Sequence, residues 1–225
     1  MRKVLIILFL AVISCKDTST NSNITTELNE TERIHIELPE LNNWNELYSD
    51  ELVKKRFDEN SNNGTTIIGV YLNNETAKRK DSLDHIDFTD YCLFFILDKE
   101  QKRKIKNTDL KKIFDIQINK TSVREIEIED AINKVYSDST LIAADKPYLL
   151  EEYSKIPKTY SAINLIKPFS DDHNYIVVYV YNLINIKNHL VYGGYYLDFN
   201  GMESIENARM NNDSIISEFV KANEK

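Results

Sequence analysis

The amino-acid sequence predicts an α+β domain in which a largely antiparallel sheet is covered by helices. Three apolar, tyrosine-rich stretches near the carboxyl end follow one another through short polar turns, as the strands of an antiparallel meander do. These stretches are residues 160–166, 175–186 and 190–199. After the turn Asn200-Gly201, apolar residues recur at helical spacing from Ile205 to Val220, which predicts a closing amphipathic helix.

The first part of the domain follows the order strand, helix. Residues 34–38 alternate apolar and polar side chains and predict a half-buried strand, which ends at Pro39. A helix is expected within residues 44–57, with Ser49 or Asn43 as its N-terminal cap.

Two strands are expected in the middle of the chain. The turn Asn62-Asn63-Gly64 leads into the apolar residues 65–72, which predict the first of them. Residues 91–97 are apolar on both faces, so this second strand is expected at the centre of the sheet.

Helices are expected between the middle strands and the meander. Thr108 can cap a short helix that runs through residues 110–114. The segment 122–125 (SVRE) matches a capping box and would open a second helix through residues 128–135. Alternating Glu and Ile at residues 125–129 favours a strand instead, so both alternatives stay open there.

The amino terminus is typical of a secretory signal. Arg2 and Lys3 form a short basic region, and residues 4–13 are an unbroken apolar run. As a helix this run would reach about 15 Å, roughly half of a hydrocarbon core. It is therefore too short for a permanent transmembrane span.

The residues Val12-Ile13-Ser14-Cys15 resemble the lipobox of bacterial lipoproteins, in which aliphatic and small residues precede an obligatory cysteine. The resemblance implies that a signal peptide, residues 1–14, is removed and that the Cys15 thiol carries a diacylglycerol. A further acyl chain such as palmitate on the new amine would make the membrane a stable partner. An ordinary secreted protein with a cysteine at its cleavage site is the alternative.

The polar stretch after the cysteine predicts a tether. Residues 15–32 comprise the lipidated cysteine and a flexible segment rich in Thr, Asn, Ser and Glu, and residues 33–225 form a single α+β domain. As a random coil the tether would span about 20–25 Å. An aspartate directly after the cysteine would resemble an inner-membrane retention signal. This chain has Lys16 at that position and Asp17 only after it. The expected location is therefore the bacterial cell envelope, at the outer rather than the inner membrane.

The order of elements resembles the α/β/α sandwich of the PsbP and Mog1 families. There an aliphatic strand ending in proline leads to a tryptophan-containing segment, as residues 36–39 (IELP) lead to Asn43-Trp44. The resemblance covers about residues 33–222 and implies a PsbP/Mog1-like fold and a non-enzymatic binding or assembly role. It carries over no functional residue. Trp44 is expected to anchor the core or the edge of the domain.

Composition and motifs exclude several function classes. The net charge of −8 argues against nucleic acid as the main partner. We find no phosphate-binding loop, dinucleotide fingerprint, zinc motif, calcium loop or nucleophile elbow, so no cofactor and no metal are expected. With Cys15 modified, Cys92 is the remaining thiol, and its apolar strand predicts a buried, inert side chain. A reactive or metal-binding thiol is the alternative.

An acidic series precedes the strand at residues 91–97. Asp81, Asp84, Asp87 and Asp90 recur every third residue, and His85 lies within the series. A metal site formed from Asp84, His85 and Asp87 in a loop is one interpretation. Helix caps and solvated turn residues explain the same spacing more simply.

A basic island follows that strand. Residues 99–112 (KEQKRKIKNTDLKK) are rich in lysine although the protein is acidic. The island could face anionic lipid or an acidic partner. A solvated loop and helix face is the simpler interpretation.

The meander carries a row of tyrosines. Tyr175, Tyr179 and Tyr181 share one face of their strand, and Tyr192 and Tyr196 share one face of the next. Such a face could bind a peptide, a glycan or a small apolar ligand, so these five residues form a candidate ligand face. Cross-strand packing beneath the closing helix is the favoured explanation.

These features favour a membrane-anchored envelope lipoprotein whose domain is a non-catalytic binding or assembly module with an envelope protein partner. No catalytic residue is assigned. An envelope hydrolase that uses Asp84, His85 or His173 from loops is one alternative, and it predicts a deep pocket with convergent polar groups. An immunity or surface-protection lipoprotein is another, and it shares every visible feature of the favoured function.

Overall fold

The computed structural model describes residues 34–80, 90–124, 127–137, 147–167 and 176–224. The signal peptide, Cys15 and the tether lie outside the described residues. So do the following candidate residues: Asp81, Asp84, His85, Asp87, His173 and Tyr175.

The described residues form an α+β fold built on one mixed sheet of eight strands, in the order β1-β2-β3-β8-β7-β6-β5-β4. Every neighbouring pair is antiparallel except β4 and β5. The strands are β1 Trp44–Glu46, β2 Thr65–Asn73, β3 Tyr91–Leu97, β4 Val123–Arg124, β5 Tyr148–Tyr153, β6 Thr159–Ile166, β7 Val177–Ile186 and β8 His189–Asp198. The helices are α1 Glu51–Asn60, α2 Asn74–Arg79, α3 Asn107–Thr121, α4 Ile128–Ser137 and α5 Glu203–Asn223, with a 3₁₀ turn at Asp98–Glu100.

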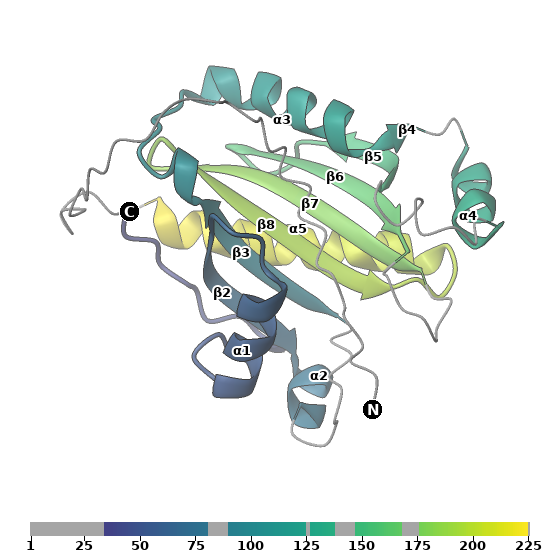
Figure 1. Cartoon of the computed structure of the whole chain (residues 1–225), viewed down its shortest axis with the longest axis horizontal. Helices are drawn as coiled ribbons and strands as arrows, with labels where there is room; N and C mark the ends of the chain where they lie inside the picture. Colours follow the sequence, from purple (N-terminus) through teal and green to yellow (C-terminus); the bar gives the residue numbers. More distant parts are fainter. Residues whose placement is uncertain (1–33, 81–89, 125–126, 138–146, 168–175, 225) are drawn as a thin grey trace, which may run out of the picture.

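Helices cover both faces of the sheet. Apolar side chains of α1 and α3 pack on one face, and those of α4 and α5 pack on the other. Figure 1 shows α5 running along the sheet beneath β7 and β8, with α3 on the opposite side. Because both faces are covered, β3 is buried at all seven positions, which confirms the central placement of residues 91–97.

The meander β6-β7-β8 confirms the expected order of the last three strands. The turn between β7 and β8 is formed by Lys187 and Asn188, whose φ angles are 49° and 67°. Two consecutive positive φ angles match the tight turn whose twist suits an antiparallel hairpin. β8 then pairs with β3 on its other side, so it joins the two halves of the sheet.

The expected strand at residues 34–38 does not form. Ile34, Ile36 and Leu38 are half-buried and alternate with exposed residues, as expected, but this segment pairs with no strand among the described residues. The amide of Asn223 in α5 takes the partner's place, because it hydrogen-bonds the backbone N–H and carbonyl of Glu37. A side chain therefore satisfies backbone groups that a neighbouring strand would otherwise pair.

The expected helices exist, but their starts differ from the prediction. Asp50 caps α1 by accepting from the N–H groups of Leu52 and Val53, in place of Ser49 or Asn43. Thr108 does not cap α3, and the 122–125 segment does not open a helix as a capping box would, because residues 123–124 form β4. α3 begins at Asn107 without a side-chain cap, and its C-cap is the serine of that segment.

Three short strands were not expected. β1 holds the half-buried Trp44, whose ring packs edge-on against Tyr195 at 5.7 Å, which confirms Trp44 as an anchor at the domain edge. β4 occupies two residues of the 122–125 segment and pairs parallel with β5. β5 carries two glutamates and a bulge between Leu149 and Glu151, which obscure its alternation in the sequence.

Among the described helices, none is both long and apolar enough to span a bilayer.

Candidate functional site

Four of the five candidate tyrosines form a layer on the face that α3 covers. We call Tyr179, Tyr181, Tyr192 and Tyr196 the tyrosine layer. Tyr179 and Tyr196 are directly opposite each other in the β7–β8 pair. Tyr192 is 2% exposed, Tyr179 and Tyr196 are 8% exposed, and Tyr181 is half-buried. The rings are therefore packed inside the domain.

One end of the layer is a stack of three rings. The Tyr196 ring stacks on Tyr91 at 4.6 Å and on Tyr179 at 4.7 Å. Gly194 makes room for this stack, since a β-carbon there would lie 3.0 Å from Tyr196 Cε2 and 3.2 Å from Tyr179 Cε2. The absence of a side chain at residue 194 is thus a packing requirement.

Hydrogen bonds hold the phenol groups at the other end. The Tyr181 hydroxyl donates to Gln117 Oε1 of α3, and Gln117 Nε2 donates to the Tyr192 hydroxyl at 3.0 Å. Tyr192 donates in turn to the carboxylate of Glu100. Burial raises the pKa of Tyr181 and Tyr192, and the hydrogen bond to Glu100 raises that of Tyr192 further. Both phenols therefore stay protonated and act as donors.

The expectation that the closing helix covers the tyrosines is wrong, because α3 covers them. The closing helix α5 packs on the opposite face, against residues of the other parity such as Val178, Val180 and Tyr195. Side-chain alternation identifies which residues share a face of the sheet. It does not identify which helix lies on that face.

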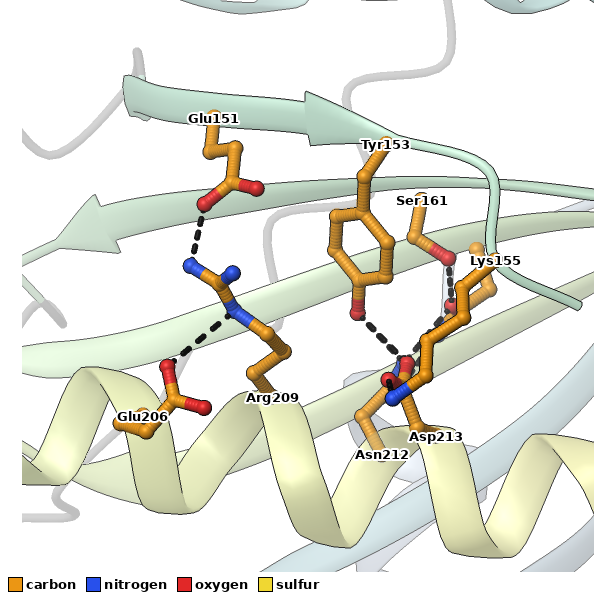
Figure 2. A network of polar contacts seen from close by, with 9 residues as sticks. Glu151, Tyr153, Lys155, Ser161, Glu206, Arg209, Asn212 and Asp213 are labelled. Atoms are coloured by element: carbon orange, nitrogen blue, oxygen red, sulfur yellow. Dashed lines mark hydrogen bonds and ion pairs between the residues drawn. The ribbon is translucent and has the colours of Figure 1, made fainter.

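A buried polar network lies between the sheet and α5 (Figure 2). Asn182 of β7 and Asn212 of α5 are fully buried and donate to each other, at 2.7 Å and 3.1 Å. The Ser161 hydroxyl donates to Asn182 Oδ1 at 2.7 Å. These polar residues interrupt apolar patterns in β7 and α5, and such interruptions are the sequence signal of a buried polar pair, although the sequence did not lead us to predict one here.

The network continues to the surface through Tyr153 and Asp213. Asn212 Nδ2 donates to the Tyr153 hydroxyl at 3.2 Å, and Tyr153 donates to Asp213 Oδ1 at 3.0 Å. Lys155 Nζ pairs with Asp213 Oδ2 at 2.9 Å, and most of the lysine side chain is exposed. Burial, with Asp213 nearby, raises the pKa of Tyr153.

A second ion-pair group ties β5 to α5. The Arg209 guanidinium hydrogen-bonds Glu151 of β5, and its Nε lies 3.5 Å from Glu206 of α5 (Figure 2). The same guanidinium lies 5.8 Å from the centre of the Tyr153 ring. Together with the buried amides, these contacts fix α5 in position along the sheet.

Asp90 is the one member of the acidic series among the described residues. It has a φ of 62° and accepts a hydrogen bond from the Tyr195 hydroxyl, to which Asn211 of α5 donates at 3.0 Å. Burial raises the Asp90 pKa, although the hydrogen bond from Tyr195 opposes the rise. Asp90 therefore serves as a turn residue that links β3 to β8.

The described side chains form contacts suited to packing and to hydrogen bonding. Ser161 donates to a carboxamide oxygen, which cannot take its proton as a general base would. Cys92 is fully buried, and burial raises the pKa of its thiol. Within the described ranges, no group of three His, Cys, Asp or Glu residues is placed to hold a metal ion.

No protein-family model, curated protein or solved structure matches this chain.

Proposed function

We propose that this chain is a membrane-anchored envelope lipoprotein, cleaved before Cys15, whose domain is a non-catalytic binding or assembly module. One observation carries the proposal: Val12-Ile13-Ser14-Cys15 directly follows a basic pair and an unbroken apolar run. Lipid on Cys15 would attach the module to its membrane, and the outer membrane of the envelope is the proposed location. The expected PsbP/Mog1-like sandwich belongs to the same proposal.

Two features of the described residues support a binding module. The polar side chains of the buried network donate to one another and so hold α5 against the sheet. The tyrosine hydroxyls are likewise bonded to Gln117 and Glu100. Groups held in this way stabilise a rigid scaffold, and a rigid scaffold suits recognition of a partner at its surface.

The lipid attachment is tested by labelling cells with a palmitate analogue. The full chain is expected to incorporate label and to sediment with membranes. Cys15→Ala should abolish the label, because the variant has no thiol at the lipidation position. Cys92→Ala is the matched control, because it removes the other cysteine of the chain. Equal labelling of the Cys15→Ala variant would overturn the lipoprotein assignment.

The binding role is tested by crosslinking in intact cells, followed by gentle solubilisation. A discrete crosslinked complex that contains one partner protein is expected for the full chain. If the chain remains uncrosslinked over a range of reagent lengths and detergents, the binding module is contradicted, while the lipid assignment stands on its own labelling result.

A further inference from the structure

The basic island gathers exposed cations at one end of the sheet. Lys99, Lys102, Lys104 and Lys106 are all exposed and lie between β3 and the start of α3. The backbone N–H of Ile105 donates to the carbonyl of Asn188 at 2.8 Å. The island is therefore fastened to the β7–β8 turn.

Other cations share this end of the molecule. Lys187 in the β7–β8 turn is exposed. The N–H of Asn185, near the end of β7, donates to the carbonyl of Lys158 at 2.9 Å, so the β5–β6 connection lies here too. We call this surface the basic end; its exposed members are Lys99, Lys102, Arg103, Lys104, Lys106, Lys158 and Lys187.

The first described residues of the domain lie at the same end. Glu37 is hydrogen-bonded to Asn223, the last residue of α5, and Lys158 Nζ lies 3.3 Å from Glu224. Figure 1 shows the first described segment beside the carboxyl-terminal end of α5, on the side of the molecule that carries the β7–β8 turn. The chain that leads from Cys15 therefore joins the domain at its basic end.

We propose that the basic end faces the membrane and binds the anionic headgroups of its phospholipids. The orientation rests on the proposed function, since lipid on Cys15 is what would place this end closest to a bilayer. The protein carries a net charge of −8, so an anionic surface repels the domain in most orientations. When the basic end faces the membrane, the membrane attracts the domain instead of repelling it. This attraction acts within about 8 Å, the screening length at physiological salt.

An anionic membrane fits this placement better than an acidic protein. A lipid anchor and a basic cluster together form the two signals that stable membrane attachment uses. The expected span of the tether, about 20–25 Å as a random coil, keeps the basic end within reach of the headgroups. Binding of an acidic protein would not require the basic end to lie where the tether joins the domain, whereas binding of the anchoring membrane would.

The test measures binding of the full-length chain with Cys15→Ala to vesicles, so that lipid on the cysteine plays no part. Vesicles of phosphatidylcholine are compared with vesicles of phosphatidylcholine and phosphatidylglycerol. The basic-end variant carries Lys99→Glu, Lys102→Glu, Lys104→Glu and Lys106→Glu. The matched control carries four equal charge changes at exposed lysines elsewhere, namely Lys55→Glu, Lys78→Glu, Lys120→Glu and Lys134→Glu.

The unaltered basic end is expected to favour the anionic vesicles, and added salt should weaken the preference. The basic-end variant should lose about a hundredfold or more in partition, since each lysine near an anionic surface contributes about fivefold. The control should lose much less. The apolar run at residues 4–13 is common to all variants and cancels in the comparison.

Equal losses in the two variants, or equal binding to both kinds of vesicle, would overturn the proposal and leave the basic end for an acidic protein. Changing the same four lysines to glutamine provides a milder set if the reversed charges prevent folding. Because Cys15 is absent from every sample, a negative labelling result for the lipid leaves the vesicle result interpretable.

Discussion

The side-chain amide of Asn223 pairs with both backbone polar groups of Glu37, although the two residues are 186 positions apart. Glu37 N–H donates to Asn223 Oδ1 at 2.8 Å, and Asn223 Nδ2 donates to the Glu37 carbonyl at 2.9 Å. The amide thus presents to Glu37 the same donor and acceptor that a neighbouring strand would present. One side chain fastens the first segment of the domain to its last helix.

Asn223→Ala is expected to destabilise the domain by about 2 kcal/mol, because it leaves two backbone groups without partners. The loss should be local first, so amide hydrogen exchange should quicken at residues 34–38 before it changes elsewhere. Urea unfolding gives the free energy. Asn207→Ala is the matched control, since Asn207 is an exposed asparagine in the same helix. Equal effects of the two changes would contradict the role assigned to Asn223.

The first segment shows how far sequence alone reaches. Alternating apolar residues predicted correctly that Ile34, Ile36 and Leu38 point inward. The pattern could not tell a strand from an extended segment, because both alternate. The difference lies in Asn223, whose partnership depends on where α5 ends in three dimensions.

Gly194→Ala is expected to cost about 1–3 kcal/mol, the usual penalty for overpacking a buried site. The added β-carbon would press on Tyr196 and Tyr179 at 3.0–3.2 Å and disturb their stack. Gly193→Ala is the control, because its nearest contacts lie at 3.3–3.4 Å on the opposite side of the sheet. Urea unfolding and near-ultraviolet circular dichroism should both report the difference. A larger cost at Gly193 would refute this account of the tyrosine stack.

The pair Asn182 and Asn212 should behave as one unit. Either residue changed to alanine leaves a buried amide without its partner, at a cost of about 2–4 kcal/mol including lost packing. The double variant should cost at least about 1 kcal/mol less than the two single changes together. A double-mutant cycle by urea unfolding measures this coupling, with Ser214→Ala as an exposed control in α5. Additive effects would show that the two amides act independently.

Asp90 should make part of the stability depend on pH in an unusual direction. Burial raises its pKa in the folded state above the ordinary value of 3.8, so this group favours folding when protonated. Its contribution is fully present below pH 3.8 and is lost as the pH rises through the folded-state pKa. Asp90→Asn stays neutral, keeps an acceptor for Tyr195 and tolerates the positive φ.

The free energy of unfolding of Asp90→Asn, relative to the unaltered protein, should therefore increase as the pH rises from about 4 toward neutrality. Urea unfolding at a series of pH values measures the difference. Asp58→Asn is a useful comparison, because the pKa of that exposed carboxyl is lowered and the slope should have the opposite sign. A difference that does not vary with pH would exclude the assigned pKa shift.

The candidate site was predictable in its composition but not in its surroundings. The even spacing between Tyr179 and Tyr181, and between Tyr192 and Tyr196, correctly predicted that each pair shares a face of its strand. Which helix covers them depends on the face of the sheet to which the chain crosses between β3 and α3. No local sequence pattern determines that face. Asn182 and Asn212 each interrupt an apolar pattern, but their pairing could not be predicted, because it forms only when the strand and the helix pack together.

The pairing of β3 with β8 also governs the order in which the fold can be completed. Tyr91–Leu97 is made well before its neighbour His189–Asp198. Until that strand arrives, one long side of β3 has no partner, and Glu37 has no Asn223. The chain must therefore be synthesised through β8 before the two halves of the sheet can join. Late closure of this kind would keep the chain unfolded during the export that we propose for it.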